Sequence, residues 1–190
     1  MLLTHYQTDL REAGADEAGR GCYAGPVFAA AVILPDNFCH PLLNDSKQVS
    51  VTNRALLRQI IETSAVSWAV ASVDHAEIDK LNILKASFKA MHLAIDQLTP
   101  KPELLLIDGN RFIPYPFTAH HCIIKGDGKY ASIAAASILA KTHRDQYMQQ
   151  IHAEFPQYGW DQNKGYGTLA HRTAIRKYGL CKYHRKSFAI

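Results

Sequence analysis

The chain has 190 residues, of which 47% are hydrophobic, and its formal net charge is +4. This length suits one domain with a sizeable core and, at most, a short appendage. No apolar run approaches the ~20 residues that cross a bilayer, and the first eleven residues lack the basic start and apolar centre of a signal peptide. The four cysteines are scattered, without the paired spacing of a zinc site. We therefore expect a cytoplasmic protein with no membrane partner.

The positive charge is concentrated at the C-terminal end. Residues 161–190 contain seven lysines and arginines and one acid, Asp161, which gives this segment a net charge of +6 and leaves −2 for the rest of the chain. Such asymmetry indicates an anionic partner for the C-terminal part. A solvated basic helix explains the same charge equally well, so charge alone does not decide between the two interpretations.

The first half of the chain is predicted to alternate strands with a helix. A first strand ends at residues 14–17, and the continuous apolar run at 27–34 is typical of a strand covered on both faces. A helix is expected at 50–63, because its apolar residues fall on one face. Residues 65–73 alternate as a half-buried strand does.

The second half continues the alternation. Residues 74–98 carry apolar side chains three or four positions apart, which predicts a long amphipathic helix with a possible break near Asn82. The remaining elements are expected at 103–108 and 121–124 as strands and at 132–155 and 168–178 as helices.

Strands that alternate with helices imply an α/β domain built on a mixed sheet. No repeat, low-complexity tract or long Gly/Ser linker divides the sequence. We therefore predict an α/β domain over residues 1–160, with a basic helical extension over residues 161–190 packed on it.

Three acidic positions share one local context. Asp16 and Glu17, Asp108, and Asp127 each close or follow an apolar strand and adjoin glycine-containing chain. The carboxyl ends of strands are where α/β sheets place their sites, so these carboxylates can converge if the strands are neighbours. Aspartate beside glycine is also ordinary turn chemistry. That alternative is the stronger one for Asp108 or Asp127 taken singly, and the weaker one for all the positions together.

Carboxylates that lie so close repel one another unless a cation neutralises them. Their oxygens are hard ligands, which favours Mg²⁺ or Mn²⁺ over zinc. Two such ions at a phosphate would activate a water for in-line displacement. Adjacent residues of a strand point to opposite faces, so we expect a turn or bulge if Asp16 and Glu17 both serve one site.

A glycine-rich segment follows the first acids. Gly19, Arg20 and Gly21 lack the ending and the spacing of a P-loop. Two glycines allow the backbone to approach a ligand closely, so its polar groups could bond a ribose hydroxyl or a phosphate. Taken alone, a tight turn between two strands explains the segment better. Further along, Arg144 and Asp145 are expected to form a surface ion pair or to support the site.

An ordered series of sequence blocks runs from residue 13 to residue 188. In order, the blocks read AGADEAGRG (13–21), AGPV (24–27), DSK (45–47), IDGN (107–110), GD (126–127), SIAAASILAK (132–141), RD (144–145), KGYGT (164–168) and HRKSF (184–188). This series closely resembles ribonuclease HII, the type 2 ribonuclease H family, over nearly the whole chain.

The resemblance implies the ribonuclease H-like fold, a mixed five-stranded sheet flanked by helices, with a C-terminal helical extension. It implies an endonuclease that hydrolyses the RNA strand of RNA–DNA hybrids and leaves 5′-phosphate and 3′-hydroxyl ends. It further implies nicking of duplex DNA on the 5′ side of an embedded ribonucleotide. Its partners would be these duplexes, and we expect a monomer.

The resemblance also implies roles for particular residues. The four metal-binding and catalytic acids map to Asp16, Glu17, Asp108 and Asp127, with two Mg²⁺ or Mn²⁺ ions. The backbone of Gly19, Arg20 and Gly21 would contact the 2′-hydroxyl, and Tyr166 would stack on the following deoxyribose. Candidate phosphate contacts are Lys47, Lys141, Lys164 and Arg185.

Few positions depart from the family pattern, and none of these removes a catalytic acid. Gln48 stands where a lysine is usual, and Gly128 follows Asp127 where alanine or serine is commoner. Arg20 and the short N-terminus argue against the sister type, ribonuclease HIII.

Two other functions remain open. One is a nucleic-acid-binding protein without catalysis, which uses only the basic C-terminal part. The other is a ribonuclease H-like nuclease specific for DNA, such as a junction resolvase.

Overall fold

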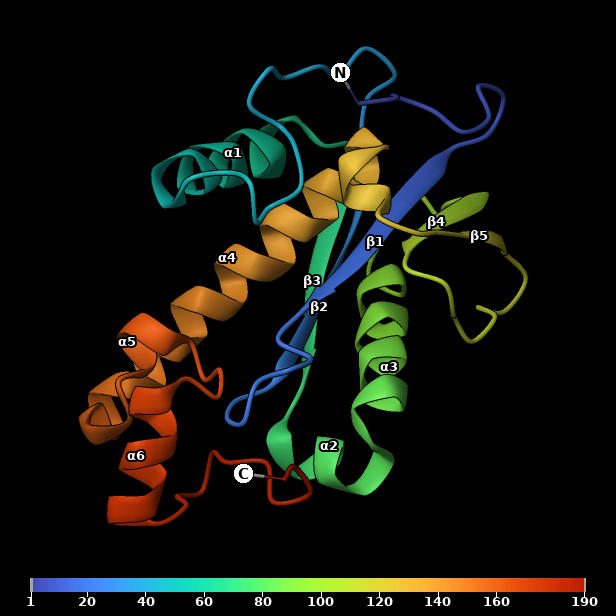
Figure 1. Cartoon of the computed structure of the whole chain (residues 1–190). Helices are drawn as coiled ribbons and strands as arrows, with labels where there is room; N and C mark the ends of the chain where they lie inside the picture. The colour runs from blue at the N-terminus through green and yellow to red at the C-terminus, as the bar shows by residue number, and fades with distance from the viewer. Residues whose placement is uncertain (1, 190) are drawn as a thin grey trace.

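The computed structural model describes residues 2–189 and is shown in Figure 1. Its centre is a five-stranded sheet in the order β3-β2-β1-β4-β5. The strands are β1 (Glu12–Ala18), β2 (Val27–Ile33), β3 (Ser67–Val73), β4 (Leu104–Asp108) and β5 (Ala119–Ile123). β1 and β3 run antiparallel to β2 between them, whereas β4 and β5 run parallel to β1. The predicted mixed five-stranded sheet is confirmed.

The helices follow the predicted order. They are α1 (Val51–Ser64), α2 (His75–Leu81), α3 (Ile83–Ile95), α4 (Ala131–Glu154), α5 (Trp160–Asn163) and α6 (Leu169–Tyr178), with 3-10 turns η1 (Gly126–Gly128) and η2 (Pro156–Tyr158). The break expected near Asn82 is confirmed: this residue has a φ of 69° and separates α2 from α3. Its side chain then caps α3 by accepting a hydrogen bond from the Lys85 amide at 3.1 Å. The short helix α5 was not predicted.

Helices cover both faces of the sheet (Figure 1). The long helix α4, with α1 beside it, packs on one face, and α3 packs on the other. Close approach of α4 depends on Gly14 in β1, where an added Cβ would lie only 2.2 Å from the backbone carbon of Ser132. No larger residue fits there, because the helix backbone already touches the strand. None of the helices within residues 2–189 is long and apolar enough to span a membrane.

The C-terminal segment packs against the far end of α4 (Figure 1). Its core joins Met148 and Ile151 of α4 to Tyr158, Trp160 and Ile175, all of them buried. The predicted boundary between residues 160 and 161 falls inside α5, and the division into two parts stays a prediction.

Candidate active site

The register of two parallel strands brings the first acids together. Ala15 of β1 pairs with Ile107 of β4, so Asp16 lies next to Asp108 where both strands end. On its other side, Asp16 pairs with Ala30 of β2. The expected convergence at the carboxyl ends of neighbouring strands is therefore present for these two residues.

Asp16 is deeply buried at the end of the sheet. Its side chain points to the α4 face, and the residue is only 6% exposed. Burial, followed by the charges of Glu17 and Asp108, raises the pKa of Asp16 well above its usual value, while a hydrogen bond with Ser137 opposes the rise. Ser137 and Ser46 have their hydroxyl oxygens 2.9 Å apart. Neither serine was predicted from the sequence as a site residue.

Glu17 reaches the same site without a bulge. The pairing of β1 with β2 continues one residue for one residue through Ala18, so the expected turn or bulge is wrong. Asp16 borders one cavity of about 220 Å³ on the α4 side, whereas Glu17 and Asp108 border both this cavity and a second one of about 280 Å³ on the α3 side. The acids thus surround the end of the sheet, beyond which the two faces are no longer separated. Burial raises the pKa of Glu17, and Arg20, which donates a hydrogen bond to it at 3.0 Å, opposes that rise.

Asp127 joins the group through the segment after β5. It lies in η1 and is 5% exposed, and the amide of the preceding Gly126 donates a 2.7 Å hydrogen bond to Asp108. Burial, the charge of Asp108 and the charge of Asp45 raise the pKa of Asp127 to about 6. Asp45 is a further acid near this site, and it was not predicted as a site residue from the sequence.

One lysine is closely associated with these acids. The ammonium of Lys47 lies 3.9 Å from Asp127 and 4.0 Å from Asp45, and its side chain is largely exposed. Within residues 2–189, no three His, Cys, Asp or Glu side chains already form a ready-made metal site. The donor set nevertheless fits a hard divalent ion, since it consists of carboxylates whose charges raise the pKa of Asp16 and attract the ammonium of Lys47.

Residues 19–21, here called the glycine turn, follow β1 and line the cavity with Asp16. Gly19 has a φ of +96°, and an added Cβ would lie 2.0 Å from the Arg144 guanidinium, so this position requires glycine for two reasons. The guanidinium of Arg185 donates to the carbonyls of Gly19 at 2.7 Å and Arg20 at 2.8 Å. Arg185 is fully buried. The expectation that it contacts a phosphate is therefore corrected: it holds the glycine turn from beneath.

Arg144 is likewise a buried structural residue. It is 1% exposed and donates to the carbonyls of Ala24, Pro26 and Lys164, at 3.2, 3.1 and 2.9 Å. The expected surface ion pair with Asp145 is wrong, because Asp145 pairs with Lys141 at 2.8 Å. A signal was available in the sequence: Arg144 lies seven residues after the buried Ser137, which is two helical turns along the same face.

Residues 164–167, here called the tyrosine loop, lie across from the glycine turn. Tyr166 is 43% exposed and lines the cavity with Asp16, as does Lys141. Lys164 borders an adjoining hollow that it shares with Lys141, and its ammonium donates to the Asp161 carbonyl at 2.5 Å. The cavity that Asp16 borders is therefore also lined by Tyr166, Lys47 and Lys141, whereas Lys164 lies to one side of it.

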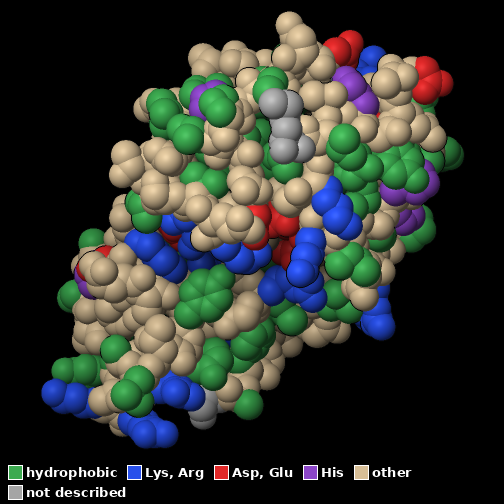
Figure 2. Space-filling view, turned by 45° about the horizontal axis from the view of Figure 1, so that its top comes forward, with side chains coloured by type: hydrophobic (Ala, Val, Ile, Leu, Met, Phe, Trp, Pro, Cys, Tyr) green, Lys and Arg blue, Asp and Glu red, His purple; other side chains and the backbone are tan. Residues whose placement is uncertain are grey.

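Charge on this face matches that arrangement. Figure 2 shows acidic side chains near the centre of the face, with lysines and arginines on both sides of them.

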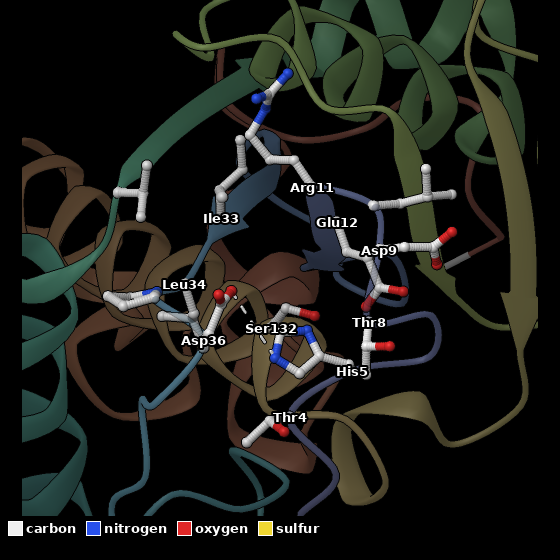
Figure 3. A pocket seen from close by; sticks show the side chains of 13 residues that line it. Thr4, His5, Thr8, Asp9, Arg11, Glu12, Ile33, Leu34, Asp36 and Ser132 are labelled. Atoms are coloured by element: carbon white, nitrogen blue, oxygen red, sulfur yellow. Dashed lines mark ion pairs between the residues drawn. The ribbon is translucent and has the colours of Figure 1, made fainter.

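A cavity of about 490 Å³ lies elsewhere, at the opposite end of β1, and none of the predicted site residues lines it (Figure 3). The residues that line it include His5 and Asp36, whose side chains lie 3.9 Å apart. The acidic group with flanking bases is thus the stronger candidate for chemistry on a polyanion.

The mixed sheet order and the acids at the adjacent ends of β1 and β4 define a nuclease of the ribonuclease H-like class. Comparison with known proteins then narrows this class. The family model for ribonuclease HII matches residues 13–190, so the chain belongs to the ribonuclease HII family. It is an endonuclease that acts on the RNA strand of RNA–DNA hybrids, and enzymes of this family are metal-dependent.

Individual relatives agree with the family. The ribonuclease HII of Parabacteroides distasonis is 61% identical over 190 residues, which is all of this chain and 96% of the relative. Among solved structures, the complex of PCNA with ribonuclease HII from Archaeoglobus fulgidus is 25% identical, with a TM-score of 0.78 and coverage of 95% of this chain and 96% of that one. Bst ribonuclease HIII with Mn²⁺, at 23% identity and a TM-score of 0.71, covers 94% of this chain but 67% of its own and supports the fold alone.

Proposed function

We propose that this chain cleaves RNA–DNA hybrids, and nicks duplex DNA 5′ of an embedded ribonucleotide, by hydrolysis with two divalent metal ions. The observation that carries the proposal is the parallel pairing of β1 with β4, which sets the buried Asp16 beside Asp108. Carboxylates buried together at a strand end are costly to the fold unless they hold a cation. If Asp16 and Asp108 were instead ordinary turn residues, their side chains would be exposed to solvent.

Four carboxylates are proposed to hold the ions. Asp16 and Asp108 would contact both, because they are the adjacent pair, and Glu17 and Asp127 would complete the ligand set from either side. When bound, Mg²⁺ or Mn²⁺ supplies an activated water and stabilises the charge that develops on the phosphate. Products with 5′-phosphate and 3′-hydroxyl ends would follow from attack of a water oxygen on phosphorus, with cleavage of the P–O3′ bond and protonation of the leaving O3′.

The substrate would lie between the glycine turn and the tyrosine loop. Backbone groups of residues 19–21 are proposed to contact the ribose 2′-hydroxyl, and Tyr166 is proposed to stack on the next sugar. The ammonium of Lys47 lies beside the acids, and Lys141, whose ammonium pairs with Asp145, lines the same cavity, so both would contact phosphates there. Lys164 would contact a phosphate further along the substrate strand. Lysine contacts of this kind add affinity without reading sequence.

We also propose that the enzyme works as a monomer in the cytoplasm. All four cysteines are free thiols, which suits a reducing compartment. Both proposals are open to direct measurement, by light scattering of the purified protein and by fractionation of cells that produce it.

The test uses labelled duplexes of DNA, RNA–DNA hybrid, and DNA with one ribonucleotide, each with Mg²⁺ or Mn²⁺. Asp16→Asn and Asp108→Asn should abolish cleavage of both ribonucleotide-containing duplexes and leave hybrid binding measurable. Asp36→Asn, an exposed acid at the other end of the sheet, is the matched control and should cleave normally. Full activity in either active-site variant refutes the metal assignment. Salt-sensitive binding without metal-dependent product indicates a binding protein, and cleavage of plain DNA indicates a DNA-specific nuclease.

A further inference from the structure

Two adjacent residues near the C-terminus are buried beneath the active site. His184 and Arg185 are both fully buried, although histidine and arginine are seldom so. Their backbone lies against residues 23–25: the Arg185 amide donates to the Tyr23 carbonyl at 2.8 Å, and Ala24 forms an antiparallel bridge with His184. Neighbouring residues of an extended chain point to opposite sides, so the two side chains serve different parts of the site.

Arg185 fixes the glycine turn. Its guanidinium donates to three carbonyls, those of Gly19, Arg20 and Gly25, at 2.7, 2.8 and 2.9 Å. In a trans peptide the N–H points opposite to the C=O of the preceding residue. Because the carbonyls of Gly19 and Arg20 point down to Arg185, the amides of Arg20 and Gly21 point away from it. No described residue accepts a hydrogen bond from either amide, which leaves both free for a ligand in the cavity that these residues line.

His184 acts on the tyrosine loop through His171. The Trp160 indole N–H donates to Nε2 of His171 at 3.1 Å, so this nitrogen carries no proton and Nδ1 of His171 donates to the Tyr166 carbonyl at 2.9 Å. The Cys181 amide donates to Nδ1 of His184 at 3.0 Å, so Nε2 of His184 is its protonated nitrogen and donates to Nε2 of His171 at 3.2 Å. Every bond in this chain is satisfied only when both rings are neutral and in opposite tautomers.

The tyrosine loop has little freedom besides this link. The Gly165 carbonyl accepts from the Tyr23 amide at 2.8 Å, and an added Cβ on Gly167 would lie 2.4 Å from the Tyr23 ring. Both ends of the loop are therefore packed on the chain that the His184 backbone also pairs with. A displacement of His184 would be passed to Tyr166 through the two imidazoles and through residues 23–24 together.

We infer that His184 and Arg185 are positioning residues that set the glycine turn and the tyrosine loop in a fixed relation, and so contribute to the choice of substrate. The inference rests on the proposed function, in which the turn reads the ribose and Tyr166 reads the junction. The two loops lie more than 140 residues apart in the sequence, yet one dipeptide is linked to both, directly to the glycine turn through Arg185 and by way of His171 to the tyrosine loop through His184. Arg185 affects recognition of any ribose, because it holds the glycine turn. His184 affects only recognition of the RNA–DNA junction, because it acts through Tyr166.

A matched pair of variants tests the His184 arm. His184→Gln keeps an amide N–H where Nε2 donates to His171, and His184→Asn keeps only an acceptor for the Cys181 amide. With Mn²⁺, we expect His184→Asn to lower kcat/KM on a duplex with one ribonucleotide by roughly tenfold, with a much smaller effect on a continuous hybrid. His184→Gln should recover most of the loss. Equal losses on the two substrates, or no recovery with glutamine, overturn the inference.

Arg185→Lys supplies the second arm. A lysine keeps the positive charge but cannot hold three carbonyls in one plane, so kcat/KM should fall on both substrates by a similar factor. A fall on only one of them contradicts the assigned division of roles. Thermal unfolding of each variant identifies any that fails to fold.

A spectroscopic measurement is independent of cleavage. In ¹⁵N-histidine-labelled wild-type protein near pH 7.5, His184 should be the Nε2–H tautomer and His171 the Nδ1–H tautomer. Any other pair of tautomers, or a protonated ring, refutes the coupling even if every variant unfolds. If wild-type protein with Mn²⁺ cleaves hybrids but never nicks at a single ribonucleotide, the proposed junction function fails, while this measurement still decides the coupling.

Discussion

The ammonium of Lys47 lies 3.9 Å from the carboxylate of Asp127, in a group of acids that is proposed to hold metal ions. Burial alone would lower the pKa of Lys47, but the charges of Asp45, Asp127 and Asp16 raise it. In the metal-free protein this exposed side chain is thus a mobile counter-charge, which a divalent ion would displace toward the substrate phosphates.

Lys47→Gln should therefore have two opposite effects. Mn²⁺ alone should bind more tightly, by about threefold, because one repelling positive charge is gone. The KM for a hybrid should rise, because a phosphate contact is lost. Calorimetric titration with Mn²⁺ and steady-state kinetics measure the two effects. Lys89→Gln, in which the replaced lysine pairs with Glu77 away from the acids, is the control. An unchanged Mn²⁺ affinity would show that Lys47 does not compete with metal.

Asp16→Asn should stabilise the metal-free protein. Burial and the charges of Glu17 and Asp108 raise the pKa of Asp16 above its value in the unfolded chain. The folded state therefore loses stability as the pH rises from the unfolded pKa to the folded pKa of this group. At neutral pH the ionised group is a net cost to the fold, and asparagine removes that cost. In EDTA near pH 7.5 we expect Tm to rise by about 4 °C.

Metal addition supplies the control for this prediction. Mn²⁺ should raise the Tm of the wild type through preferential binding to the folded state, and should raise that of Asp16→Asn much less. If asparagine lowers Tm in EDTA, Asp16 is a structural residue whose partners outweigh its neighbours' repulsion.

The sequence allowed the acidic site to be predicted because it depends on short-range patterns. Apolar runs located the strand ends, and the acids follow those runs directly, so only the adjacency of β1 and β4 was missing. The rule that alternate residues face opposite sides was correct for Asp16 and Glu17. The deduced bulge was wrong, because a site at the end of a sheet is reached from both faces.

The hydrogen-bond partners of the supporting arginines were not predictable in this way. Arg144 and Arg185 bond to backbone carbonyls, which every residue has, at positions 20 to 166 residues away. No residue type marks such an acceptor, and an arginine in a basic segment is indistinguishable by composition from one that binds phosphate. The same holds for His184, whose partner is a second histidine, His171, that no motif or spacing pairs with it.

Acid should destabilise the protein through this histidine pair. Burial, and secondly the charge of His171, lower the pKa of His184 to about 4, below the usual 6.5. Because the folded state favours the neutral ring, this histidine stabilises the fold at pH values above the pKa it has in the unfolded chain. This stabilisation is lost as the pH falls from there toward 4. Tyr23, His75, Tyr158, Cys181 and Tyr183 surround the pair, and none of them is an acid that could stabilise a protonated ring.

Urea unfolding at pH 7 and pH 5 measures this effect. From His184 we expect a loss of about 2 kcal/mol in the free energy of unfolding between the two values. His184→Gln has no titrating ring at this position and keeps the donor to His171, so its loss over the same interval should be smaller by that amount. Identical losses in the variant and the wild type would assign the acid sensitivity to other groups.

Tyr166→Ala should separate the two activities proposed for the site. The half-exposed ring faces the cavity that Asp16 lines, where it would stack on the sugar that follows the ribonucleotide. On a duplex with one ribonucleotide, loss of the ring should lower kcat/KM by roughly tenfold, a magnitude typical of a lost stacking contact. A continuous hybrid offers a ribose at every step, so the same variant should lose less on it.

Tyr166→Phe keeps the ring and removes only the hydroxyl, which lies by Cys22, and should retain the wild-type preference. Side-by-side kinetics on the two duplexes measure the ratio, and an equal loss on both with alanine means that Tyr166 supports the fold of the loop and reads no junction.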